Sequence, residues 1–127
     1  MSRRRVVSAS PYETAYGFRR ALRIGDRIEV AGTAPIPQDG SEPPPSAHDQ
    51  MLLCGRLALD AIAELGGSPE HVVRTRMFIV DAADSDEIGR AHRELFGSAP
   101  PVATMVVVAG LLDPSWRVEI EVEAIVD

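Results

Sequence analysis

The sequence predicts an α+β fold of two layers, in which a mixed β-sheet is covered on one face by two helices. Apolar residues recur at the spacing of an amphipathic helix in only two segments of the 127 residues. The other ordered segments alternate in polarity or are rich in β-branched residues, as strands are. Because the segments follow the order strands, helix, strand, helix, strands, we interpret residues 1–127 as a single domain with one core.

The first third of the chain predicts three strands and a long loop. Gly25 and Asp26 separate two strand-like segments, and a Gly-Asp dipeptide suits a tight hairpin. Five prolines then interrupt regular structure before the first helix. The predicted elements are a strand at 3–8, a polar turn at Ser10-Pro11, strands at 18–24 and 27–33, and a loop at 35–45.

The rest of the chain predicts two helices and three more strands. In the first helix, Met51, Cys54, Ala58 and Ile62 recur every three or four residues, and a pair of glycines ends the pattern. The second helix is ended by a glycine and a pair of prolines. The predicted ranges are helices at 46–65 and 85–96 and strands at 71–80, 102–109 and 117–126.

The strand at 102–109 is apolar on both of its predicted faces. Its even positions hold valine or threonine, and its odd positions hold alanine, methionine or valine. Such a strand is typically buried on both sides. Since two helices cover only one face of a sheet, we expect the second face to pack against another subunit in a closed homo-oligomer.

Composition and charge exclude several classes of function. The net charge of -6 and the pI near 5.0 argue against nucleic acid as a partner, because phosphate contacts need a basic surface. No apolar run approaches the roughly 20 residues of a membrane helix, and the first residues do not resemble a signal peptide. The single cysteine, Cys54, forms no internal disulfide and fits a reducing cytoplasm.

Residue types that are missing narrow the chemistry further. All 13 basic residues are arginine, so no lysine exists to form a Schiff base or to anchor pyridoxal phosphate. The histidines His48, His71 and His92 lie in separate segments without the spacing of metal ligands. We therefore expect neither a metal nor a cofactor, which leaves carboxylates, arginines, hydroxyls and backbone amides for the chemistry.

Three carboxylates stand in a row on the last predicted strand. Glu119, Glu121 and Glu123 point to one face, and the apolar residues between them point to the other. Ionised carboxylates at this spacing repel each other. Either that face is open to water or one of the three glutamates has a functional role.

Four stretches together resemble the Rid family (reactive intermediate deaminases, also called YjgF-like or endoribonuclease L-PSP-like). They are IEVAGTAPI at 28–36, HVVRTRMFIVDAAD at 71–84, GRAHRELFG at 89–97, and PPVATMVVVAGLLDP with VEIEVEA within 100–124. The resemblance implies a chorismate-mutase-like α+β fold, a homotrimer, and ligand clefts between subunits. It also implies hydrolysis of reactive enamines and imines to a keto acid and ammonia.

The resemblance assigns site residues only in part. The family's catalytic glutamate corresponds to Glu119, or to Glu121 in a shifted alignment. The arginine that clamps the substrate carboxylate is replaced by Ala103, and a cleft tyrosine is replaced by Phe18. The positions that correspond to the ligand cleft are Phe18, Ala31, Gly32, Thr33, Gly89, Ala103, Thr104 and Met105.

These residues and the resemblance are compatible with two functions of different classes, and with a third that is less favoured. The first is hydrolysis of a small imine-like or otherwise electrophilic substrate, with Glu119 orienting water. The alternative is a trimeric module that binds a metabolite without turnover. The third is the ribonuclease or translation-inhibitor activity described for some relatives, which the acidic charge disfavours. The candidate replacements for the missing clamp are Arg19, Arg20, Arg23, Arg74 and Arg76, although each of them also fits an ion pair or a solvated surface.

Overall fold

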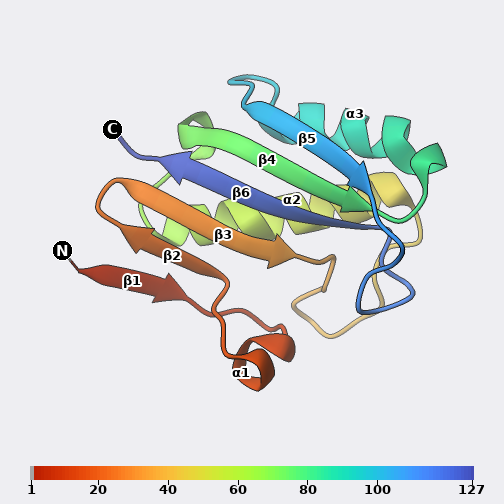
Figure 1. Cartoon of the computed structure of the whole chain (residues 1–127), viewed down its shortest axis with the longest axis horizontal. Helices are drawn as coiled ribbons and strands as arrows, with labels where there is room; N and C mark the ends of the chain where they lie inside the picture. The colour runs from red at the N-terminus through yellow and green to blue at the C-terminus, as the bar shows by residue number, and fades with distance from the viewer. Residues whose placement is uncertain (1) are drawn as a thin grey trace.

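The computed structural model describes residues 2–127, which form one six-stranded mixed sheet with two long helices (Figure 1). The strand order is β1-β2-β3-β6-β4-β5; β4 and β5 run parallel, and every other pair is antiparallel. The elements are β1 (Arg3–Val6), α1 (Tyr12–Tyr16), β2 (Ala21–Ile24), β3 (Arg27–Thr33), α2 (Ala47–Glu64), β4 (Val72–Ile79), α3 (Ser85–Phe96), β5 (Val102–Val107) and β6 (Val118–Ile125), with 3₁₀ turns at Pro69–His71 and Ala82–Asp84.

Helices α2 and α3 lie on the same face of the sheet and bury the core against it (Figure 1). Met51 and Ile62 of α2 and Ile120 of β6 are fully buried between the two layers. The predicted two-layer α+β fold is therefore confirmed. Within residues 2–127, no helix combines the length and the apolar character needed to span a bilayer.

Hydrogen bonds from side chains fix both ends of α2, close to the predicted limits. The Ser46 side chain accepts a hydrogen bond from the Asp49 amide and thereby caps the first turn. At the other end, Arg4 and Arg23 both donate to the carbonyl oxygen of Leu65, at 3.2 and 2.6 Å. Cations at this end also offset the negative pole of the helix dipole. These contacts tie β1 and β2 to the end of α2.

The predicted alternation along β6 is confirmed. Residues such as Val118 and Ile120 are fully buried on the helix side. Glu119, Glu121 and Glu123 are partly exposed on the opposite side, which we call the open face of the sheet.

The structure differs from the sequence prediction between β1 and β2. A five-residue helix, α1, follows Pro11 where we expected only a turn, and β2 begins at Ala21 rather than at Phe18. Helix α1 is too short to show a period, and tertiary contacts stabilise it. Tyr12 packs edge-to-face on the buried Trp116, at 6.1 Å between ring centres. Trp116 is thus a core anchor within the chain.

Strand β5 also differs from expectation. It ends at Val107 rather than at 109, and it forms the outer edge of the sheet. Val102 and Val107 are each 58% exposed, so neither side of the strand is buried within one chain. The edge position explains this, since β5 has a neighbouring strand on one side only.

Candidate functional site

The predicted site residues fall into two groups that lie far apart in one chain. The first group lies where β3 meets β6 and comprises Ala31, Gly32, Thr33 and Glu119, with Phe18 nearby in the segment between α1 and β2. The second group lies on α3 and β5 and comprises Gly89, Ala103, Thr104 and Met105. Strands β6 and β4 separate β3 from β5 in the sheet. With neighbouring strands about 4.8 Å apart, three steps separate the groups by roughly 14 Å.

Members of the two groups also face different sides of the sheet, although Thr104, paired with Arg76, shares the open face with Glu119, and the buried Thr33 is paired with Ile120 on the helix side. Ala103 is paired with Thr75, which is fully buried on the helix side, and Met105 is paired with the buried Met77. Glu119 lies on the open face with Phe78 as its neighbour. Within one chain Met105 and Glu119 therefore lie on opposite faces of the sheet, because the parallel register of β5 directs Met105 toward the helices. That the two residues line one cleft between subunits stays a prediction.

Glu119 lies against the backbone of Gly32. The register of β3 against β6 shifts between Val30 and Thr33, and this irregularity brings Gly32 close to the carboxylate. A Cβ atom on Gly32 would lie 2.9 Å from Glu119 Oε1. The close approach therefore requires glycine at position 32.

The surroundings of Glu119 favour its protonated form. Partial burial raises the pKa of the Glu119 carboxyl above its ordinary value, while the positive charge of Arg20 lowers it and the charge of Glu121 raises it. A raised pKa makes the Glu119 carboxylate a stronger base than an ordinary, solvated glutamate.

The other two glutamates of the row share one cation. Arg76 Nη1 lies 3.6 Å from Glu121 Oε1 and 3.1 Å from Glu123 Oε1. This arrangement confirms the ion-pair interpretation of Arg76. It also distinguishes Glu119, for which the structure shows no ion pair within residues 2–127.

A buried arginine fixes the backbone beside Glu119. Arg20 Nη1 donates to the Gly32 carbonyl at 2.6 Å and to Thr33 Oγ1 at 2.9 Å. Its charge is balanced by Glu13 of α1, with Nη2 3.4 Å from Oε2, and both side chains are at least nine-tenths buried. Glu13 also accepts hydrogen bonds from Ser8. This network holds the irregular end of β3 and, with it, Gly32.

Sequence reasoning did not identify the pair of Glu13 and Arg20. Arg20 was one of several arginines in the region, and Glu13 lies on a helix that was not predicted. No periodic signal could have placed Arg20 on the buried side, because residues 18–20 lie outside the regular part of β2.

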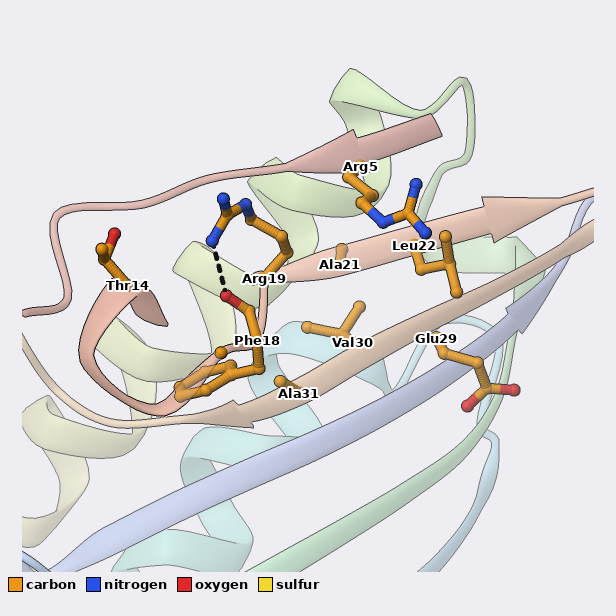
Figure 2. Close-up of a pocket in the computed structure, with 10 residues that line it drawn as sticks. Arg5, Thr14, Phe18, Arg19, Ala21, Leu22, Glu29, Val30 and Ala31 are labelled. Carbon is orange, nitrogen blue, oxygen red and sulfur yellow. Dashed lines mark hydrogen bonds between the residues drawn. The ribbon is translucent and has the colours of Figure 1, made fainter. Parts of the chain in front are cut away.

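Beside this network the open face is hollowed between α1 and strands β1 to β3. The hollow has a volume of about 590 Å³ and contains two residues of the first predicted group, Phe18 and Ala31 (Figure 2). The guanidinium of Arg20 lies 5.7 Å from the centre of the Phe18 ring. The full lining is Arg5, Thr14, Gly17, Phe18, Arg19, Ala21, Leu22, Glu29, Val30 and Ala31.

Other reactive side chains have structural roles. His92 of α3 is hydrogen-bonded to Thr75 Oγ1 at 2.7 Å, and burial lowers the pKa of its imidazole. Cys54 is completely buried, and burial raises the pKa of its thiol. Within residues 2–127, no three His, Cys, Asp or Glu side chains gather closely enough to hold a metal ion.

Comparisons with known proteins agree on one family. The endoribonuclease L-PSP family model matches residues 8–126. The uncharacterized protein SCO2049 of Streptomyces coelicolor is 44% identical over 121 residues, or 95% of this chain and 90% of that protein. The crystal structure of Rv2704 from Mycobacterium tuberculosis, described as a YjgF/YER057c/UK114 family member, is similar with a TM-score of 0.88 and 38% identity, covering 98% of this chain and 100% of that chain.

A more distant structure shares the fold. The crystal structure of E. coli TdcF with bound serine has a TM-score of 0.82 at 22% identity, covering 97% of this chain and 94% of that chain. The match of the family model over nearly the whole chain, with a relative of 44% identity, agrees with the resemblance to Rid proteins. The chain therefore belongs to the endoribonuclease L-PSP family, which includes the YjgF-like proteins.

Proposed function

We propose that residues 1–127 form a single domain that assembles as a homotrimer and hydrolyses a small imine-like or enamine-like substrate in a cleft between subunits. The observation that carries this proposal is the environment of Glu119. Its carboxylate is half-buried against Gly32, has a raised pKa and has no cation paired with it within residues 2–127. Glu121 shares Arg76 with Glu123, which favours Glu119 over Glu121 as the functional glutamate.

In this proposal Glu119 acts as a general base toward water. The oxygen of water forms a bond to the carbon of the C=N group, and Glu119 takes the proton that the water loses. Glu119 passes that proton to the substrate nitrogen as the C=N double bond becomes single. In the resulting carbinolamine the hydroxyl proton moves to the nitrogen, the C–N bond breaks, and ammonia leaves as the carbon becomes a carbonyl. The backbone of Gly32 lies beside the carboxylate and can help to orient the substrate. The hydroxyl of Thr33 is buried and already donates to the Ala31 carbonyl, so it supports the backbone of β3.

The separation of the two predicted groups supports assembly. Gly89, Ala103 and Met105 lie on or near the edge strand β5, and Glu119 lies on the open face of β6, two strands away. Only a second copy of the chain can bring one group opposite the other. The apolar side chains exposed along β5, including Val102 and Val107, would be covered in the same assembly.

A binding module without turnover is the alternative. Two observations favour it: Ala103 offers only a methyl group where deaminating relatives have an arginine, and the buried Arg20 already has Glu13 as its partner.

The name of the matched family keeps ribonuclease activity as a third candidate. The net charge of -6 and the glutamates of the open face disfavour it. Because Cys54 is a buried thiol, a reducing cytoplasm remains the expected location.

The test compares two glutamates of the same strand. Imino acids generated in the assay are followed by ammonia release, using the wild type, Glu119→Gln and the matched control Glu123→Gln. We expect Glu119→Gln to lower turnover by roughly two to four orders of magnitude and Glu123→Gln to change it little. Turnover that survives Glu119→Gln but collapses with Glu121→Gln would assign the role to Glu121. If no small electrophile is hydrolysed, the binding module replaces the hydrolase.

A further inference from the structure

We infer that the hollow between α1 and strands β1 to β3 binds the carboxylate of a small apolar organic acid, with Arg5 and Arg19 as its anchors. We call this hollow the Arg5–Arg19 pocket. The inference rests on the proposed function and names the substrate class of the same site. It also provides, from residues of one chain, the carboxylate contact that Ala103 cannot make.

The contacts of the nearby arginines show which of them are free to bind a ligand. Arg20 is buried with Glu13. Arg23 donates to the Leu65 carbonyl at 2.6 Å and to the Gly25 carbonyl at 2.8 Å. Arg27 Nε lies 2.6 Å from a carboxylate oxygen of Glu29. Each of these three guanidinium groups is therefore occupied by the protein itself.

Arg5 and Arg19 remain available on the open face. Both are exposed, and no carboxylate within residues 2–127 forms an ion pair with either of them. Figure 2 shows Arg19 bonded to the Phe18 carbonyl, a contact of 3.0 Å that uses one Nη group. Because a guanidinium has five N–H donors, Arg19 keeps several for a ligand. Arginine binds carboxylates through paired, charge-assisted hydrogen bonds.

The charge of the pocket is positive on balance. Glu29 is the one acidic residue among the ten that line it, and Arg27 already neutralises that carboxylate. Among the described residues, the lining therefore contains two arginines without an ion-pair partner, Arg5 and Arg19, and no carboxylate that lacks one. This local charge is opposite in sign to the net charge of -6 of the whole chain, so it would select anions from solution.

The floor of the pocket is apolar. Phe18, Leu22 and Ala31 contribute hydrocarbon surface below the two guanidinium groups (Figure 2). A volume of about 590 Å³ lies in the range of small-molecule sites. Hydrocarbon surface with a few charged groups at the rim fits an aliphatic or aromatic acid better than a sugar or a bare phosphate.

The position of Glu119 orients such a ligand. Ala31 lines the pocket and is followed by Gly32, which contacts the Glu119 carboxylate. A negatively charged group is attracted to Arg5 and Arg19 and repelled by Glu119, so the carboxylate of the ligand lies on the β1–β2 side. Its uncharged, electrophilic part then lies toward Gly32 and Glu119. The pocket therefore selects carboxylic acids whose reactive carbon is in a separate, neutral group.

The experiment uses 4-(trifluoromethyl)benzoate as the probe and 4-(trifluoromethyl)benzamide as its neutral analogue, with ¹⁹F NMR titration of the full chain. We expect the benzoate to bind and the benzamide to bind much more weakly. The double variant Arg5→Gln/Arg19→Gln should weaken benzoate binding at least tenfold, or about 1.4 kcal/mol. Both side chains are exposed, so the double variant should keep the wild-type circular dichroism spectrum.

The matched control is Arg56→Gln/Arg93→Gln, which removes the same charge from two exposed arginines outside the pocket. It should leave benzoate binding unchanged. Equal weakening in both double variants, equal binding of the benzamide, or no benzoate binding at millimolar concentration would overturn the inference. Loss of affinity for a short single-stranded RNA in the pocket variant alone would also overturn it in favour of nucleic acid.

One further variant separates this inference from the proposed function. Glu119→Gln should abolish turnover while benzoate binding is kept or strengthened, because a negative charge is removed from the far side of the pocket. Benzoate binding without any turnover in the wild type would refute the hydrolase and retain the pocket. Turnover of neutral substrates with no benzoate binding would refute the pocket and retain the hydrolase.

Discussion

The ion pair between Glu13 and Arg20 should contribute strongly to stability, and Glu13→Ala tests this. The variant removes the one carboxylate that pairs with Arg20 among residues 2–127 and leaves the guanidinium buried at a side-chain exposure of 7%. The hydrogen bonds of Arg20 to Gly32 and Thr33 remain, so some of its N–H donors keep their acceptors. The main loss is the compensation of a buried positive charge.

Breaking a buried ion pair by deleting one partner typically costs about 3–5 kcal/mol. Because Arg20 keeps two short hydrogen bonds, we take the lower end, about 3 kcal/mol. For a chain of 127 residues this corresponds to a fall of roughly 10 °C in Tm. Glu13→Gln should cost less, since the amide oxygen still accepts a hydrogen bond from the guanidinium.

Urea unfolding followed by circular dichroism measures the effect, at one fixed protomer concentration because assembly changes apparent stability. The control is Glu29→Ala, which breaks the exposed pair with Arg27, whose side chains are 57% and 42% exposed. Exposed pairs contribute about 1 kcal/mol or less. If Glu13→Ala costs no more than Glu29→Ala, the proposed role of the buried network is wrong.

Three further outcomes are expected. Gly32→Ala should displace the Glu119 carboxylate, because the new Cβ would lie 2.9 Å from Oε1; we expect turnover to fall at least about tenfold while the unfolding free energy changes by no more than roughly 1–3 kcal/mol. Hydrogen bonds to Asp49 and Glu94 raise the pKa of His48 above its ordinary 6.5, so the stability they contribute is fully present below that pH and is lost as pH rises through the raised folded value. His48→Gln should remove this loss in urea titrations between about pH 5 and pH 9, and an unchanged pH profile would contradict it. Val107→Glu should leave the fold intact, since Val107 is 58% exposed in one chain, but should convert a particle of about three times 13.7 kDa into monomers by light scattering; a wild type that is already monomeric would refute the trimer.

Regular elements could be predicted because their patterns are long enough to be unambiguous. Helix α2 has 18 residues with a repeating apolar stripe, a serine at its start and glycines after its end. The row from Glu119 to Glu123 follows directly from the two-residue period of a strand. Helix α1, with five residues, has no measurable period, and its stability comes from partners such as Trp116 that are distant in sequence.

The candidate site was only partly predictable for a different physical reason. The alternation of side chains in a strand shows which residues share a face, but not which face looks toward the helices. For β5 that choice depends on its parallel register with β4, which directs Ala103 and Met105 to the helix side. Arg5 is absent from the sequence-derived site because its position beside Leu22 exists only after β1 pairs with β2.

The central place of β6 in the sheet has a consequence for folding during synthesis. Strand β6 pairs with both β3 and β4, and in the described part of the chain no other strand connects the β1–β2–β3 half to the β4–β5 half. It follows all other strands in the chain, so the two halves of the sheet are made before the strand that joins them. Until residues 118–125 leave the ribosome, both halves expose unpaired edges and an incomplete core. A nascent chain that stalls before this point would be prone to aggregation and to chaperone binding, and cooperative folding should begin only when β6 inserts.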